Sequence, residues 1–219
     1  MSHANLFTQA DFSTEIGVTT DLLISKDSEQ TVQGIRQLRR PFYALAIREL
    51  HRLSNHSNLM YRIAAKGELD TLDIQFRKRI YKIRQKLRQE PDYPGYQLAL
   101  AVVFLRYSQI WPHVPENRSY FLAQSNKILN RLIRLVQPEV RYFYYRGVVR
   151  KEMGDFRGAI SDFRKVLYLN PTHWGTFMRL LESLFELGEF QKIPLIIDSW
   201  PGIFRHSFQQ TIANMWKTK

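Results

Sequence analysis

The chain has 219 residues, of which 44% are apolar and 24% charged, a balance typical of a soluble globular protein. It contains no cysteine, which excludes disulfides and thiolate chemistry. The longest uncharged stretches, 93–105 among them, have 13 residues, whereas a membrane-spanning helix needs about 20 apolar residues. No basic and apolar signal segment stands at the N-terminus. We therefore expect a cytoplasmic protein, either free or at the inner face of a membrane within a larger protein or complex.

The formal net charge of +12 is unevenly distributed along the chain. Residues 1–30 hold one lysine and five acidic residues, a net charge of 1 − 5 = −4, which leaves +16 on residues 31–219. Such an excess of positive charge favours anionic partners, namely an acidic protein, a lipid surface or nucleic acid.

The N-terminal part of the chain changes character near residue 31. Residues 1–30 show no clear hydrophobic period, and we interpret them as an N-terminal arm. From Thr31 the pattern becomes helical to about Leu53, and a polar turn follows at 54–58. A short helix then ends near Gly67. The segment 31–69 is similar to a HEAT-type helical region.

The next segment predicts a strongly amphipathic helix from about Asp70 to Gln89. Its apolar residues step by three or four along one stripe. The opposite face carries the basic residues Arg77, Lys78, Lys82, Arg84, Lys86 and Arg88, together with Arg79. Residues 36–88 hold 14 Lys/Arg and 4 Asp/Glu, a net charge of 14 − 4 = +10.

This basic face has three interpretations. It suits contact with an anionic membrane surface, or contact with the phosphates of a nucleic acid. The third is an ordinary solvated face of an amphipathic helix. Because no aromatic ladder or RNA-binding signature accompanies the charges, nucleic acid is the weaker of the two functional interpretations.

Two more helices are expected before the most informative part of the chain, at 96–110 and 120–136. A 32-residue segment beginning at Val140 then reads VRYFYYRGVVRKEMGDFRGAISDFRKVLYLNP. Its marker residues are an aromatic, a small residue, a Gly-Asp turn, a second small residue, an aromatic and a final proline: Phe143, Gly147, Gly154, Asp155, Ala159, Phe163 and Pro171.

This pattern resembles the tetratricopeptide repeat family, whose unit is a 34-residue helical hairpin. Arg146 and Arg150 depart from the family pattern, where a leucine and a tyrosine are usual, and they predict an edge more exposed than in an average repeat. The alternative is an unrelated helical hairpin with Gly-Asp at its turn.

A second copy of the pattern starts at Trp174. Its offset from Val140 is 174 − 140 = 34, which equals the family's period and is called one repeat length below. Gly188 repeats the turn, and Pro194 stands early in a less regular second helix. The tail 203–216 carries apolar residues at helical spacing and predicts a capping helix, which a terminal repeat requires.

The resemblance implies an all-α fold, a helical-hairpin solenoid with tetratricopeptide repeats in the C-terminal half and a C-terminal capping helix. It divides the chain into the arm 1–30, the helical region 31–69, a basic helix and degenerate repeat at 70–136, and repeats with the cap at 137–219.

In the family, the first helix of each pair lines a concave groove that binds an extended or helical peptide. The corresponding positions here are Leu98, Val102, Arg106, Tyr144, Val148, Lys151, Met178, Glu182 and Phe185. Tyr144 and Val148 stand where carboxylate-clamping members carry lysine or asparagine, which argues against that function. The alternative is that these residues pack against a neighbouring helix or against the N-terminal arm.

The sequence carries no recognised catalytic or metal-binding motif, and we expect neither a catalytic residue, a metal nor a cofactor. We predict a scaffold or adaptor that recruits a protein or peptide through the groove, with an anionic membrane surface as a further partner. The layout also looks similar to the tetratricopeptide part of Pel-type exopolysaccharide export proteins, which implies a role in bacterial secretion or exopolysaccharide assembly. The alternative function is nucleic-acid binding through residues 36–88.

Overall fold

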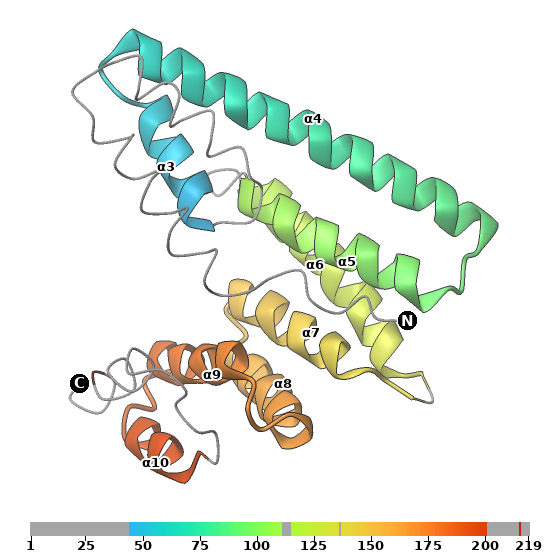
Figure 1. The fold of residues 1–219 in the computed structure, drawn as a ribbon, viewed down its shortest axis with the longest axis vertical. Helices are drawn as coiled ribbons and strands as arrows, with labels where there is room; N and C mark the ends of the chain where they lie inside the picture. The colour runs from blue at the N-terminus through green and yellow to red at the C-terminus, as the bar shows by residue number, and fades with distance from the viewer. Residues whose placement is uncertain (1–43, 111–114, 136, 201–214, 216–219) are drawn as a thin grey trace. The chain divides into compact units, whose positions relative to one another are not determined.

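The computed structural model describes residues 44–110, 115–135, 137–200 and 215. Within these residues the chain forms eight helices and no strand, which confirms the all-α class. The helices are α3 (Ala44–Ser54), α4 (Leu59–Gln89), α5 (Pro94–Ile110), α6 (Pro115–Ile133), α7 (Val140–Glu152), α8 (Phe156–Leu169), α9 (Trp174–Glu186) and α10 (Lys192–Ser199) (Figure 1).

The chain divides into two compact units, residues 1–79 and 80–219. In the first unit, α3 ends at Ser54 and Asn58 starts α4 by accepting a hydrogen bond from the Met60 backbone N–H at 2.9 Å, as an N-cap residue does. Leu50 and Leu72 are fully buried there. The predicted arm at 1–30 lies outside the described residues, and the four-part division of the chain stays a prediction.

Helix α4 corrects the prediction of two separate helices on either side of Gly67. It runs without interruption for 31 residues, and the Thr71 hydroxyl donates to the Gly67 carbonyl at 2.8 Å. A glycine ends a helix efficiently when it adopts positive φ, and in the described part of the chain only Gly154 and Gly188 do so. At Gly67 the residue merely lowers helix propensity, by about 1 kcal/mol relative to alanine.

The second unit is a chain of helices from α5 to α10, in which each helix packs against the next (Figure 1). In addition, α7 contacts both α5 and α9. The first helices α5, α7 and α9 are therefore neighbours in that order, as first helices are when helical hairpins stack in one direction. One core runs through these helices and includes the fully buried Leu129, Phe163 and Leu181.

The first helical pair, α7 and α8, is held by a close approach at Gly147. A Cβ atom placed on Gly147 would lie 2.6 Å from Cε1 of Phe163, so only glycine lets this ring reach the α7 backbone. Ala159 and Phe163 are both fully buried. Gly147 and Phe163 thus form the close contact between α7 and α8.

The second pair, α9 and α10, begins at Trp174, one repeat length after the start of the first pair at Val140. Its second helix has only 8 residues, against 14 in α8. Pro194 is accommodated because it stands in the first turn of α10, where the backbone N–H has no partner inside the helix. The predicted capping helix at 203–216 lies outside the described residues, except for Met215.

The turns of the two pairs share one hydrogen-bonding scheme at positions one repeat length apart. Gly154 has φ +81° and Gly188 has φ +79°. The N–H after each glycine donates to a carbonyl five residues back at 2.9 Å, from Asp155 to Arg150 and from Glu189 to Leu184. This is the Schellman arrangement, which needs a left-handed residue and so favours glycine.

Candidate functional site

The nine residues predicted for a binding groove all lie on the first helices of the successive pairs: Leu98, Val102 and Arg106 on α5, Tyr144, Val148 and Lys151 on α7, and Met178, Glu182 and Phe185 on α9. Because α7 contacts both α5 and α9, the three helices present neighbouring surfaces. We call this surface the α5–α7–α9 face.

The burial of two of the nine residues corrects the prediction that they line a groove. Leu98 and Val148 are only 6% exposed and belong to the core shared by the helices. Their side chains stabilise the stack from inside and cannot line an open groove. Val102, Tyr144 and Met178 are half-buried, so each offers part of its surface to a partner.

Charged residues of the face are tied to one another by ion pairs between helices. Lys151 on α7 pairs with Glu182 on α9, and Glu152 on α7 pairs with Arg118 on α6 at 2.7 Å. These pairs neutralise four charges and link α7 to both α6 and α9. They leave the aromatic and aliphatic side chains as the groups available to attract a partner.

Aromatic side chains cluster at two places on this surface. Tyr144 lies against Tyr145 and His173, with ring centroids 5.3 and 5.5 Å apart. Phe185 is 37% exposed and meets Phe190, which is 49% exposed, edge to face at 5.1 Å. Exposed aromatic pairs of this kind are preferred contact groups at protein interfaces.

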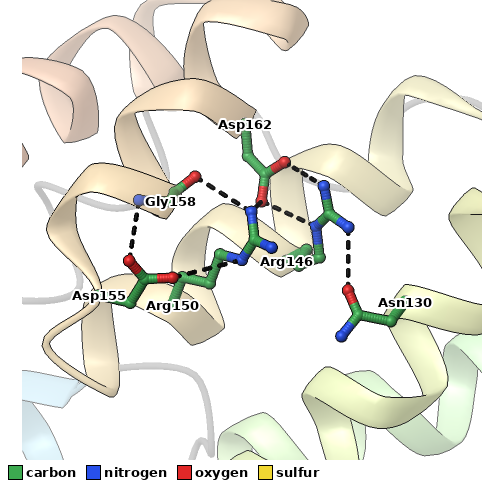
Figure 2. A network of polar contacts seen from close by, with 6 residues as sticks. All are labelled: Asn130, Arg146, Arg150, Asp155, Gly158 and Asp162. Carbon is green, nitrogen blue, oxygen red and sulfur yellow. Dashed lines mark hydrogen bonds and ion pairs between the residues drawn. The ribbon is translucent and has the colours of Figure 1, made fainter.

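A buried polar network at Arg146 and Arg150 overturns the prediction of an exposed edge. Asp162 on α8 accepts from Arg146 Nη2 at 2.6 Å and from Arg150 Nη1 at 3.0 Å. The Asp162 side chain is 3% exposed and the arginine side chains 16% and 23%. Figure 2 shows both guanidinium groups converging on this carboxylate, while Arg146 also donates to Asn130 of α6 at 2.9 Å.

The network has a structural character because its donors and acceptors satisfy one another. Arg150 also donates to the Gly158 carbonyl at 3.3 Å, and Asp155 accepts from the Gly158 N–H at 2.9 Å to cap α8. Sequence reasoning missed this cluster. The available signal was Asp162 itself, an acidic residue directly before the core residue Phe163.

The start of α7 carries a second polar cluster, formed by Glu139, Arg141 and Tyr142. Hydrogen bonds from Arg141 and Tyr142 lower the pKa of Glu139, and the bond to Glu139 raises the pKa of Arg141. Burial, followed by the 2.7 Å hydrogen bond that the phenol donates to Glu139, raises the pKa of Tyr142 to about 12. The cluster ties the first turn of α7 to the preceding loop.

The basic face predicted on α4 is exposed along its whole length. Arg77, Lys78, Lys82, Arg84, Lys86 and Arg88 are all exposed, as is Arg79. Arg77 pairs with Asp73 at 2.7 Å. In the second unit, the Arg84 guanidinium lies 5.8 Å from the centre of the Phe104 ring, and Lys86 Nζ lies 5.1 Å from that of Tyr96.

Two negative findings apply to the described residues. They contain no group of three or more histidine, cysteine or acidic residues that could hold a metal ion. None of their helices is both long enough and apolar enough to cross a membrane.

Comparison with known proteins returned nothing: no family model, no curated protein and no solved structure matches this chain.

Proposed function

We propose that this protein is an interaction scaffold, a short tetratricopeptide-type solenoid that recruits a protein partner on its α5–α7–α9 face. The observation that carries the proposal is the repeated turn. Gly154 and Gly188 stand one repeat length apart with nearly the same positive φ, and their flanking N–H groups make the same hydrogen bonds. A period of about 34 residues in helical hairpins is the mark of the tetratricopeptide family.

The stacking of alternate helices supports the same proposal. Repeats of this type bind through the surface that their first helices share, and here α5, α7 and α9 are neighbours in that order. The C-terminal cap and the concave groove belong to the proposal as well.

The chemistry of the face favours a partner segment with apolar and aromatic side chains. Lys151 and Glu182 already neutralise each other, so a charged peptide would have to displace an existing ion pair. Tyr144, Met178 and Phe185 each keep part of their surface exposed. An extended or helical peptide with two or three apolar anchors is the ligand that such a surface suits.

A cross-linking capture from the native cell, read by mass spectrometry, tests the proposal. The face variant is Tyr144→Glu with Phe185→Glu. The matched control, Tyr168→Glu with Leu195→Glu, changes side chains that are 79% and 68% exposed on the second helices α8 and α10. Both variants add two negative charges, and circular dichroism must show native helicity for each.

We expect at least one protein to be captured by the unaltered chain and by the control but lost from the face variant. If all three capture the same proteins, the α5–α7–α9 face is not the binding surface. If only the control variant loses them, the second helices bind the partner instead. Either result overturns the proposed geometry.

Nucleic-acid binding through residues 36–88 is the second candidate function, supported by the exposed cations of α4. Residues 36–43 of that region lie outside the described part of the chain. A role in bacterial secretion or exopolysaccharide assembly, at the cytoplasmic face of a membrane, rests on the resemblance to Pel-type proteins and stays a prediction.

A further inference from the structure

Helix α4 carries a line of exposed residues that the scaffold proposal does not use. Ile74, Lys78, Tyr81, Gln85 and Arg88 follow one another at spacings of four, three, four and three residues, so they lie on one side of the helix. All five are exposed, with Ile74 at 65% and Tyr81 at 60%. Lys82 stands beside this line, four residues after Lys78. We call these six residues the 74–88 face of α4.

The positive charge of this face is not compensated within the described part of the chain. The twelve residues 77–88 contain seven Lys/Arg and no Asp/Glu, a net charge of 7 − 0 = +7. Arg77 is engaged with Asp73, whereas Lys78, Lys82 and Arg88 make no ion pair with a described residue. A row of such cations attracts a polyanionic surface over a distance of about one Debye length.

The apolar members decide which polyanion fits. Ile74 and Tyr81 stand among the cations of the line, and their apolar surface is open to solvent. A phosphate backbone gains nothing from an isoleucine, whereas the headgroup region of a bilayer buries aliphatic and aromatic side chains between the lipids. Tyrosine in particular favours the interface, because its ring is apolar and its hydroxyl is polar.

We propose that the 74–88 face of α4 binds an anionic lipid bilayer, with the lysines and arginines on the headgroups and Ile74 and Tyr81 between them. This face shares no residue with the α5–α7–α9 face, so lipid and protein partner would not compete for the same side chains. All six residues of the 74–88 face lie on one continuous helix, α4.

The test is co-sedimentation of the full chain with vesicles of phosphatidylcholine alone or of phosphatidylcholine mixed with phosphatidylserine. The charge variant is Lys82→Gln with Arg88→Gln. Its matched control, Arg157→Gln with Arg164→Gln, neutralises two exposed arginines of α8 that make no ion pair with a described residue. Both variants lower the net charge from +12 to 12 − 2 = +10, and glutamine preserves helix propensity.

We expect binding only to the vesicles that contain phosphatidylserine. Each basic residue at the surface contributes about a fivefold gain in partitioning, so the charge variant should bind about 30-fold more weakly while the control stays within about twofold. Tyr81→Ala should lower the partitioning by about fivefold, because it removes apolar surface without changing the charge.

A duplex DNA oligonucleotide and a single-stranded RNA, measured by fluorescence anisotropy, separate lipid from nucleic acid. The proposal is overturned if these ligands bind as tightly as the anionic vesicles and Tyr81→Ala changes neither affinity. It is equally overturned if the charge variant and the α8 control bind the vesicles alike, since net charge alone would then explain the binding. The face variant Tyr144→Glu with Phe185→Glu should keep full vesicle binding, which distinguishes a failure here from a failure of the scaffold proposal.

Discussion

The two helical pairs at 140–169 and 174–199 have the same turn but different interiors. In the first pair, Arg146 and Arg150 enclose the buried Asp162. The positions one repeat length later, in the first helix of the second pair, hold Leu180 and Leu184, which are 3% and 0% exposed. The same contact between two helices is therefore ionic in one pair and apolar in the other.

The two pairs also distribute side-chain volume differently between their facing helices. Gly147 lies under Phe163 in the first pair, and the equivalent residues of the second pair are Leu181 and Ile197, both buried. Where the first pair has a glycine beneath a large ring, the second pair has two aliphatic residues of intermediate size. The comparison teaches that the turn sets the register of each pair, while the interior needs only complementary volume and satisfied polar groups.

Removing Asp162 should have the largest effect on this comparison. Asp162→Ala leaves two partly buried guanidinium groups without their shared carboxylate, and we expect a loss of about 3 kcal/mol in the free energy of unfolding. The measurement is urea denaturation followed by circular dichroism. Ser161→Ala, an exposed neighbour on α8, is the control and should change stability by less than about 0.5 kcal/mol.

Transplanting the interior of the second pair sharpens the same test. The triple variant Arg146→Leu, Arg150→Leu, Asp162→Ile carries the residues found one repeat length later in the chain. Since apolar residues of similar volume replace ion networks at little cost, it should recover most of the stability lost by Asp162→Ala. A triple variant less stable than Asp162→Ala would mean that the two interiors are not equivalent.

The sequence predicted the backbone of these pairs well because turns and hydrophobic periods are local. Gly154 and Gly188 mark the turns directly, and the start of the first pair at Val140 follows from the spacing of the marker residues. The state of Arg146 and Arg150 was predicted wrongly, because it depends on Asp162, which lies further along the chain on the facing helix. Pairing across helices is a tertiary property that a single residue pattern does not contain.

The candidate face was predictable to a similar degree. Its positions on the first helices follow from the repeat, but the burial of Leu98 and Val148 and the pairing of Lys151 with Glu182 depend on how closely the helices stack. For helix α4 the side chains were predicted better than the backbone. The exposure of its cations follows from its own periodicity, whereas its continuity through Gly67 was missed because glycine lowers helix propensity without forbidding the helix.

The close approach at Gly147 should have the next largest effect. Gly147→Leu copies the second pair into the first and forces the new side chain against Phe163, at a cost of about 2 kcal/mol in the free energy of unfolding. Adding Phe163→Ile supplies the smaller partner found at Ile197 and should restore more than half of that loss. Urea denaturation of both single variants and the double variant gives the coupling energy.

The coupling is the quantity that decides this prediction. Residues in direct contact usually couple by about 0.5–3 kcal/mol. If the losses from Gly147→Leu and Phe163→Ile simply add, the smaller side chain at position 163 does not make room for the larger one at position 147. The two helices must then accommodate the leucine by moving other side chains.

The smallest effect at neutral pH concerns the first turns of α7 and α9, which are fixed by different groups. Glu139 and Tyr142 hold the start of α7, whereas at the equivalent positions of α9 the His173 ring accepts from the Thr176 N–H at 3.1 Å. The pKa of Tyr142 is raised to about 12, so the folded state favours the neutral phenol. Its contribution to stability is complete below the ordinary tyrosine pKa of about 10 and is lost as the pH rises towards 12.

Tyr142→Phe removes the titrating group from the start of α7 while keeping the buried ring. We expect the free energy of unfolding of the unaltered chain to fall between about pH 10 and pH 12, with Tyr142 contributing at most about 1.4 kcal/mol for each pH unit. The variant should show a shallower fall over that window. Tyr168→Phe, in which the altered tyrosine is 79% exposed, is the matched control and should follow the unaltered chain. Equal slopes for Tyr142→Phe and Tyr168→Phe would show that the α7 cluster does not hold the phenol neutral.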